Sequence, residues 1–459
     1  FAESVMSKRP RILRSQRKII GDFDLIHPDA AGIDAGSEQH YVSVPEGRST
    51  ESVRTFGTFT SDLSALATWL VSCRVKTVAI EATGVYWIPL YEILQQHGLD
   101  PRLVDSRSIG KRNKKTDVLD CQWLRQLHSY GLLDAAFRPA SELLPVRALS
   151  RQRQMLIEYA SDHIRHIIKA LDLMNVKLHL VLSDTVGVTG MKIIRAILAG
   201  RTDPKELATL RERGCKGSEQ DFVKALSGNY RSEHLFVLKQ AVDLFETYQT
   251  SIAECDAELE RALGRLNKQA DPTALEKRTP KRRRKNQPHF DARTLLYEIA
   301  GVDLTAVHGL ETGSLLTIVS EVGVDMSLWP SAKAFAAWLA LSPNNRSTGG
   351  KPLSKRAPLI RPNRAAQAFR IAAQTLERSQ CALGAFFRRI QSRLGRPGAI
   401  KATAHKLAII FYSMIKDRTE YQDMGTAYYE ERYRQRLFNS LTKKAAILGF
   451  TLTPLHQVH

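Results

Sequence analysis

The first third of the chain alternates between short apolar runs and longer stretches with helical periodicity. Five segments have the apolar and β-branched composition of buried strands: 30–35, 41–44, 53–59, 75–80 and 103–104. Helical periodicity follows the third, fourth and fifth of these segments. Ser61 and Thr116 are the expected capping residues of the first and third helices, and Gly98 is the expected end of the second. The pattern predicts an α/β domain over residues 22–140.

The predicted order is three strands, helix, strand, helix, strand, helix. That is the order of a ribonuclease-H-like (RuvC-like) domain, in which the first and fourth strands are neighbours. Side chains that follow these two strands are then expected at the same edge of the sheet.

Residues 141–270 have a different periodicity, with apolar residues seven apart. Two series carry it, each accompanied by apolar residues three places later: Ile157, Ile164, Leu171 and Leu178; then Leu238, Phe245, Ile252, Leu259 and Leu266. Such seams predict long helices that pack as an antiparallel hairpin within one chain, or as a coiled coil between chains. The periodicity itself favours neither arrangement.

The remaining parts of the chain are set apart by charge and proline. Residues 1–21 form a basic tail, and residues 271–291 form a basic, proline-containing linker. The linker's basic residues are expected either to contact phosphates or to be a solvated tether; those predicted to bind nucleic acid are Lys281, Arg282, Arg283, Arg284 and Lys285. Residues 292–415 are predicted to be a mostly helical domain anchored by aromatic residues, and residues 416–459 a peripheral extension.

Composition narrows the function classes. Lys and Arg number 67 against 47 Asp and Glu, a formal charge of +20, which favours a polyanionic partner. With 43% hydrophobic residues the chain is globular rather than disordered, and no apolar run is long enough to span a membrane. The five scattered cysteines form no C-x-x-C pair, so we expect reduced cytosolic thiols and neither disulfides nor a structural zinc site.

Four acids fall where a metal site needs them in such a domain. Asp34 ends the first strand between Gly32 and Gly36, which are expected to let a ligand approach the backbone, and Glu81 follows the fourth strand. Asp117 and Asp120 lie three apart on the third helix and share a face. Converging carboxylates repel one another unless a cation neutralises them, and oxygen ligands favour Mg²⁺ or Mn²⁺. Taken singly, Asp34 fits a turn residue and Asp117 a residue at a helix start.

A second candidate lies in the carboxy-terminal domain, in the stretch from Arg346 to Lys351. Arg346 and Lys351 are expected to attract phosphate, and Ser347 offers a hydroxyl between them. The stretch is not a P-loop, because its glycines follow the serine, and a basic surface loop is the alternative. Thr348 and Ser342 are alternative hydroxyls. His163 and His166 have the spacing of metal ligands without a third partner, and the tyrosines near residue 430 are expected to pack rather than to stack on bases.

These residues, in this order, resemble the DEDD transposases of bacterial insertion sequences, family 110; the length and the extended middle region resemble its group 1111 branch. The resemblance implies that Asp34, Glu81, Asp117 and Asp120 hold Mg²⁺ and that Ser347 attacks DNA to form a 5′-phosphoserine link. It also implies a structured guide RNA (bridge RNA or seekRNA) that pairs with donor and target double-stranded DNA, homodimers that pair into tetramers, and a nucleoid-associated protein of the bacterial cytoplasm.

Two other functions remain open on the residues alone. The acidic quartet also suits a Holliday-junction nuclease that uses water in place of a serine. A non-catalytic nucleic-acid scaffold would need only the positive charge.

Overall fold

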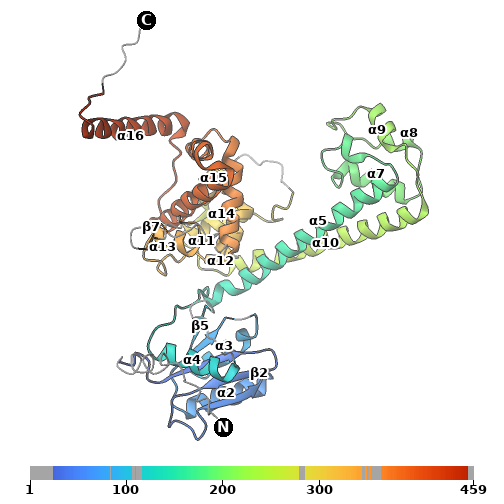
Figure 1. Cartoon of the computed structure of the whole chain (residues 1–459). Coiled ribbons are helices and arrows are strands. Elements are labelled where there is room, and N and C mark those ends of the chain that lie inside the picture. The colour runs from blue at the N-terminus through green and yellow to red at the C-terminus, as the bar shows by residue number, and fades with distance from the viewer. Residues whose placement is uncertain are drawn as a thin grey trace, which may run out of the picture. The chain divides into compact units, whose positions relative to one another are not determined.

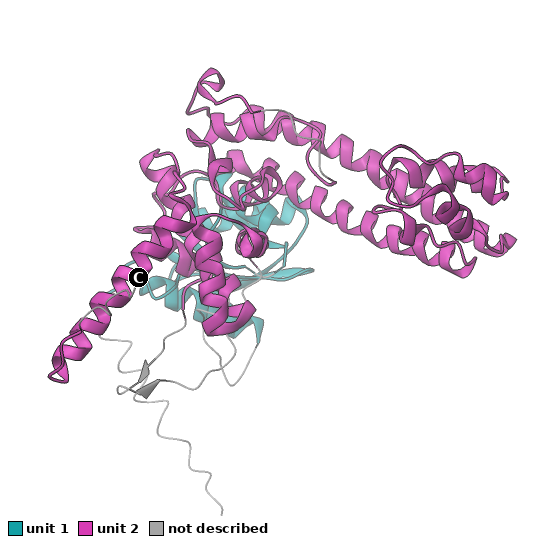
Figure 2. Ribbon diagram, turned by 90° about the horizontal axis from the view of Figure 1, so that it is seen from above, with its two compact units in different colours: residues 1–138 teal, residues 139–459 magenta. Residues whose placement is uncertain are grey.

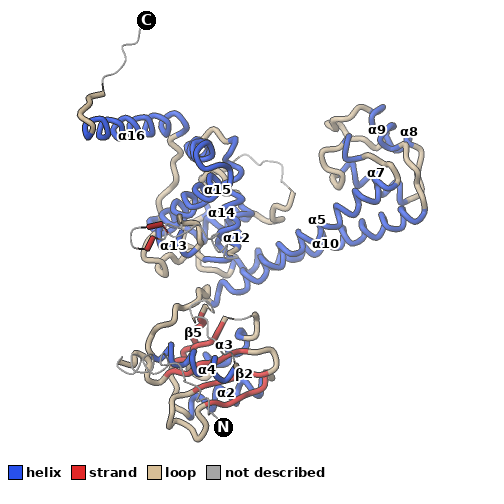
Figure 3. Tube along the Cα trace, viewed as in Figure 1, coloured by secondary structure: helices blue, strands red, loops and turns tan. Residues whose placement is uncertain are grey.

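The computed structural model describes residues 24–82, 84–105, 109, 116–278, 285–343, 347–348, 351–352 and 363–452. The predicted basic tail, residues 1–21, lies outside them. The chain divides into two compact units, residues 1–138 and 139–459 (Figure 2), and each is described by itself. Figure 3 shows that the long strands belong to the first unit and that the second is built from helices, apart from one pair of two-residue strands.

The first unit is built on a five-stranded mixed sheet. Its strands are β1 (Ala30–Ala35), β2 (Gln39–Ser43), β3 (Val53–Gly57), β4 (Thr77–Glu81) and β5 (Asp100–Val104). They lie in the order β3-β2-β1-β4-β5. Strand β2 is antiparallel to both β1 and β3, whereas β4 is parallel to both β1 and β5. This is the ribonuclease-H-like arrangement that the sequence predicts.

Three helices cover the two faces of this sheet. Helices α2 (Thr60–Ser72) and α3 (Trp87–Gln96) pack on the face that carries Ile33 and Ile80, and α4 (Asp117–Ser129) covers the other face. Alternate residues of each strand therefore face opposite helices. The predicted cap Thr116 accepts a hydrogen bond from the Leu119 N–H at 3.4 Å.

The prediction that Ser61 caps the first helix is wrong. Helix α2 begins at Thr60, so Ser61 lies inside the helix and Phe59 occupies the capping position. The Asp62 carboxylate accepts a hydrogen bond from the Phe59 N–H at 3.2 Å, which is the reverse half of a capping box. Phe59 itself has no side-chain oxygen that could accept from the first-turn N–H groups of the helix.

The second unit begins with two long helices that pack along each other (Figure 1). They are α5 (Leu144–Leu173) and α10 (Ser232–Gly264). The ring centroids of Tyr159 and Tyr248 lie 5.8 Å apart, and nearer the start of α5 the Cys255 thiol donates to the Leu149 carbonyl at 3.3 Å, so the helices are antiparallel. The predicted seams therefore meet as a hairpin within one chain.

The first seam is shorter than predicted, because Leu178 does not belong to the same helix as Leu171. Helix α5 ends at Leu173, and Asn175 adopts a left-handed conformation with φ of 58°. The Val176 N–H donates to the Leu171 carbonyl at 2.8 Å, which closes the helix end. Leu178 begins a separate short helix.

Shorter helices between α5 and α10 share their apolar core. They are α6 (Leu178–Val181), α7 (Val188–Leu198), α8 (Pro204–Ala208) and α9 (Glu219–Leu226). Phe222 of α9 is fully buried in this core.

A buried ion pair fixes the hairpin to the segment that follows it. The Arg153 guanidinium pairs with the Asp256 carboxylate across the two helices, and both side chains are buried. Asp256 also accepts from the His289 backbone N–H at 3.0 Å, and Arg153 donates to the Asn286 carbonyl at 3.1 Å. Removing one partner of such a pair leaves a buried charge unpaired, which commonly costs about 3 to 5 kcal/mol.

The rest of the second unit is a helical body with an aromatic core. Its helical elements after the single turn η2 (Pro272–Ala274) are α11 (Ala292–Ala300), η3 (Leu304–Ala306), α12 (Thr312–Val322), α13 (Ala332–Trp338), α14 (Arg364–Thr375), η4 (Leu376–Arg378) and α15 (Ala382–Asp417). Trp329 packs on Phe335 with ring centroids 4.9 Å apart, and the Tyr412 hydroxyl donates to the Trp329 carbonyl at 2.8 Å. Of the apolar anchors predicted from the sequence, Trp329, Phe335 and Leu341 are thus core residues, whereas Trp338 is partly buried.

Helix α16 (Gly425–Ile447) follows α15 and buries none of its residues. Within the described parts of the chain, no helix combines the length and the apolar character needed to cross a membrane.

Candidate active site and nucleic-acid contacts

Asp34 and Glu81 lie side by side at the carboxyl edge of the sheet. Strands β1 and β4 are paired in parallel register up to Ile33 and Ile80, and Asp34 and Glu81 are the next residue of each strand. In parallel register, residues that follow a matched pair point to the same face. Both acids are half-buried and point to the face covered by α4. The sequence prediction that the two carboxylates share an edge is therefore confirmed for their backbone positions.

Helix α4 crosses this face with its amino terminus at the same edge. Near its other end the His128 ring lies 3.0 Å from the Thr77 hydroxyl, at the start of β4. The helix therefore runs antiparallel to β1 and β4. This direction brings Asp117 and Asp120, which lie in its first turn, to the edge that carries Asp34 and Glu81.

Gly32 permits this close packing. A Cβ atom built on Gly32 would lie 2.3 Å from the backbone nitrogen of Arg125 and 2.5 Å from the carbonyl oxygen of Cys121, closer than side-chain atoms approach backbone. The glycines beside Asp34 thus serve different contacts from those expected. Gly32 admits the helix, and Gly36 closes the β1–β2 turn by donating to the Gln39 carbonyl at 3.1 Å. The expectation that they let a ligand approach the backbone stays a prediction.

The buried Cys121 thiol lies close to two of the acids, Asp34 and Asp120. Burial, together with the charges of Asp34 and Asp120, raises the pKa of Cys121 to about 12. Asp34 from β1 and Asp120 from α4 therefore act on one point between strand and helix. Asp117, one turn earlier on α4, is exposed.

The chemistry of the four side chains suits a hard divalent cation. Among the described residues, these acids do not bring three ligand atoms within 4.8 Å of one another. Mg²⁺ does not require such a closed set, because it keeps several waters and is held by one or two carboxylates with substrate phosphates. Asp34 and Glu81 would form the central pair of ligands, with Asp120 beside them.

Ser347 belongs to the other unit. It lies in β6 (Ser347–Thr348), which pairs with β7 (Lys351–Pro352), so that Ser347 is opposite Pro352 and Thr348 opposite Lys351. The alternative hydroxyl of Ser342 precedes this hairpin. Arg346 lies outside the described residues, and the hairpin is described only by its backbone.

The basic linker is described only at its ends, and Lys281, Arg282, Arg283 and Arg284 lie outside the described residues. At one end the Arg278 guanidinium lies 3.0 Å from the Asp303 carboxylate. At the other the Lys285 ammonium lies 3.2 Å from the Asp184 carboxylate. Only the Lys285–Asp184 pair has both side chains exposed. Such a surface pair is worth about 1 kcal/mol or less, so a phosphate could displace the acid from Lys285 at little cost.

A cluster of cations between α15 and α16 was not predicted from the sequence. The Arg389 guanidinium lies 4.1 Å from the centroid of the Tyr433 ring, and the Lys406 ammonium lies 4.7 Å from that of Phe386. Burial, with the charges of Arg389 and Arg436, lowers the pKa of Lys406. Within the described part of the chain no carboxylate pairs with these three cations. We call Arg389, Lys406 and Arg436 the α15–α16 cation cluster.

One of the tyrosines near residue 430, Tyr429, packs against α15, whereas Tyr428 and Tyr433 are exposed. Tyr429 lies against Phe386, with ring centroids 6.3 Å apart. Because the cluster joins residues of two helices, no spacing along the chain predicts it.

Two further features do not form a site. His163 and His166 lie edge to face, and His163 stacks on Tyr248, so they pack on the hairpin.

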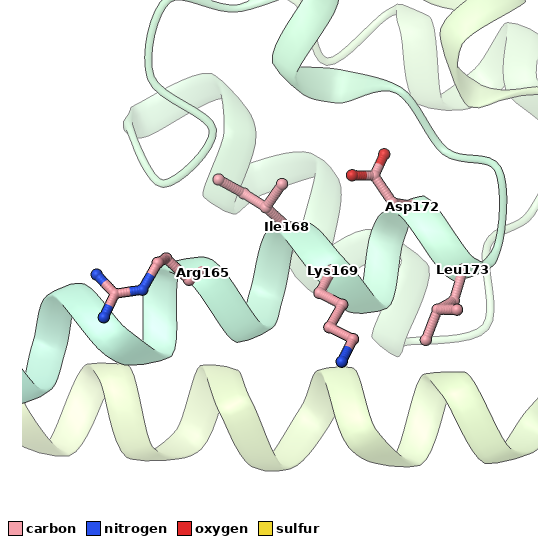
Figure 4. Close-up of a pocket in the computed structure, with 5 residues that line it drawn as sticks. All are labelled: Arg165, Ile168, Lys169, Asp172 and Leu173. Atoms are coloured by element: carbon pink, nitrogen blue, oxygen red, sulfur yellow. The ribbon is translucent and has the colours of Figure 1, made fainter.

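An open hollow beside α5 is lined by five residues of that one helix, Arg165, Ile168, Lys169, Asp172 and Leu173 (Figure 4). Asp172 already pairs with Lys177 at 2.9 Å. The side chains that line the hollow do not point toward a common centre, as catalytic groups do.

Two segments of the chain match known protein families. Residues 31–176 match a family described as a DEDD transposase of the IS110 type, and residues 302–387 match the transposase IS116/IS110/IS902 family. Together the two matches cover half of the chain. The chain belongs to the IS110 family of transposases. A comparison with curated proteins gave no match.

The first match contains all four acids of this IS110-family transposase. The second contains the β6–β7 hairpin with Ser347. The chain is accordingly a DNA transposase, and its substrate is DNA.

Proposed function

We propose that this transposase cuts and rejoins DNA through a covalent link to Ser347, with Mg²⁺ held by Asp34, Glu81, Asp117 and Asp120. The observation that carries the proposal is the pairing of β1 with β4. It brings Asp34 and Glu81 together at the edge where α4 begins. Mn²⁺ has the same ligand preference and is the expected substitute.

The covalent step conserves a phosphodiester bond. The Ser347 oxygen forms a bond to phosphorus as the bond from phosphorus to the 3′ oxygen of the DNA breaks. The serine gives up its proton, and the leaving oxygen gains one. A 3′ hydroxyl of another strand then attacks the 5′-phosphoserine and restores the serine, so rejoining requires no ATP. Bound Mg²⁺ would neutralise the charge that develops on the phosphate.

The residues of the chain have separate tasks in this scheme. The four acids hold the cation and keep it at the carboxyl edge of the sheet. Arg346 and Lys351 flank Ser347 in sequence and would hold the DNA phosphate near its hydroxyl. Asp34 and Ser347 belong to different units, and we propose that one protomer's acids act with another protomer's serine in a homodimer that pairs into a tetramer.

Sequence selection is proposed to reside in a structured guide RNA that pairs with donor and target DNA. A protein that delegates sequence reading to base pairing needs phosphate contacts more than base contacts. The net charge of +20, the linker arginines and the α15–α16 cation cluster suit that task. We place the transposase in the group 1111 branch of the family and at the bacterial nucleoid.

A denaturing gel tests the proposal. Wild-type protein with Mg²⁺, the copurifying RNA and labelled DNA should give a protein–DNA adduct, and Ser347→Ala should give none. Thr348→Ala and Ser342→Ala should retain the adduct. Cleavage that survives Ser347→Ala without an adduct would instead establish a water-using nuclease. No cleavage by wild-type protein, with binding unaffected by Asp34→Asn, would establish a scaffold.

A further inference from the structure

Three side chains from distant parts of the second unit meet at the start of α15. They are His308, which follows η3, Cys381, which precedes α15, and Asp423, which precedes α16. One ligand atom from each lies within 4.8 Å of the others, and no other group of this kind occurs among the residues that the structure describes. We propose that these three residues bind a Zn²⁺ ion.

Hydrogen bonding explains only part of this cluster. Cys381 caps α15 by accepting from the Gly384 N–H at 3.3 Å, and one oxygen of Asp423 accepts from the Ala382 N–H at 3.1 Å. The other oxygen of Asp423 lies 3.9 Å from Nδ1 of His308. That separation is too long for a hydrogen bond. It is close to the roughly 3.3 to 3.7 Å between two ligands of one tetrahedral zinc ion, given Zn–ligand distances of about 2.0 to 2.3 Å.

The positions of the three ligands are held by the fold. His308 lies in the turn in which the Leu310 N–H donates to the Val307 carbonyl at 3.0 Å. The next residue, Gly309, has φ of 91°, and a Cβ on it would lie 2.9 Å from the Ala372 carbonyl oxygen, so the turn packs closely on α14. Cys381 is 1% exposed, whereas His308 is half exposed, so the site opens on one side.

The ligand chemistry selects zinc rather than magnesium. A thiolate and an imidazole are ligands for Zn²⁺, and Mg²⁺ prefers oxygen ligands alone. Three protein ligands leave a fourth position, which water can reach past His308. The spacing of the cysteines could not predict this site, because Cys381 is its only thiol and its other ligands come from segments far away in sequence. The expectation of no structural zinc site rested on that spacing.

A zinc ion here would tie three segments together. It would join the turn before α12, the start of α15 and the segment that leads into α16. It would thereby fix the base of α16, whose Arg436 belongs to the α15–α16 cation cluster. This inference does not depend on the proposed serine chemistry.

Cobalt substitution of the full-length protein tests the inference. Co²⁺ added to metal-free protein should give a near-ultraviolet thiolate band and visible bands typical of tetrahedral coordination, and these bands should saturate at one equivalent of Co²⁺ bound at this site. Cys381→Ser should lose the thiolate band. His308→Ala removes a half-exposed side chain, should fold normally by circular dichroism, and should bind Co²⁺ and Zn²⁺ at least about tenfold more weakly.

Two other cysteines are the controls. Cys215→Ser should leave the spectrum unchanged. Cys121→Ser separates the proposed site from the DEDD acids, because Cys121 lies beside Asp34 and Asp120. The inference is overturned by a thiolate band that persists in Cys381→Ser, that disappears in Cys121→Ser, or that is absent from wild-type protein saturated with Co²⁺.

Discussion

Asp34 and Glu81 follow directly after Ile33 and Ile80, the last matched pair of two parallel strands, and both face helix α4. A hairpin of local strands could not bring them together, because helix α2 and strand β3 separate them in sequence. The pairing of β1 with β4 is therefore the fold's contribution to the candidate metal site.

Removing one carboxylate of this pair should abolish metal-dependent cleavage. Asp34→Asn keeps the shape of the side chain and removes its charge, so we expect cleavage to fall by at least about 100-fold, more than loss of an outer-shell group costs. Glu51→Gln, an exposed acid of the same unit, is the matched control and should cleave normally. Rates measured over a Mg²⁺ titration check this, and equal rates for Asp34→Asn and Glu51→Gln would remove Asp34 from the site.

Gly32→Ala should separate the acids without touching any of them. The added methyl group would meet the backbone of α4, so the helix must move or the unit must lose stability, by about 1 to 3 kcal/mol. Gly264→Ala is the control, because a Cβ there meets nothing within 4 Å. The unfolding temperature and the cleavage rate should both fall in Gly32→Ala, and neither should fall in Gly264→Ala. Normal behaviour of both variants would show that α4 does not need the glycine.

How far the sequence predicts this molecule depends on the range of the contacts. The order of strands and helices along the first unit and the cap at Thr116 follow from local patterns. The aromatic core around Phe335 follows from local patterns as well. The choice between hairpin and intermolecular coiled coil does not, because the same seam satisfies both; Cys255 contacting Leu149 decides it. The role of Gly32 depends on a helix about ninety residues later in the chain, which no local pattern encodes.

Buried His128 makes the first unit sensitive to acid. Burial, with nearby His27 and Arg102, lowers the pKa of His128 to about 4, although Asp100 opposes the shift. The unfolded chain has a histidine pKa near 6.5. Below pH 6.5 the unfolded state therefore binds a proton that the folded state does not, and stability falls. The contribution of neutral His128 to the free energy of unfolding is fully present above pH 6.5. Up to about 3 kcal/mol of it is lost between pH 6.5 and 4.

His128→Gln should flatten this dependence, since glutamine does not titrate and can still reach the Thr77 hydroxyl. His97→Gln changes an exposed histidine and should keep the wild-type dependence. Thermal unfolding at pH 7 and pH 5 distinguishes them. If the unfolding temperature of His128→Gln falls between pH 7 and pH 5 as much as that of the wild-type protein, the acid sensitivity belongs to other groups.

The linker arginines are expected to contact phosphate. Replacing Arg282, Arg283 and Arg284 by Gln should reduce the slope of log binding constant against log salt by up to about one unit per lost contact. A filter-binding titration with the copurifying RNA and with DNA measures the slope. An unchanged slope would make the linker a tether, whereas the α15–α16 cation cluster would remain a candidate for phosphate contact.

The most direct test of the central claim is to find the atom that carries the DNA. Trypsin should release the segment 347–355 from the adduct, because Pro352 protects the bond after Lys351. After nuclease treatment, fragmentation of this peptide by mass spectrometry should locate the phosphonucleotide on Ser347 in wild-type protein, and Asp34→Asn protein should give none. A nucleotide on Thr348 or elsewhere, or cleaved DNA ends with no modified peptide, would contradict the account.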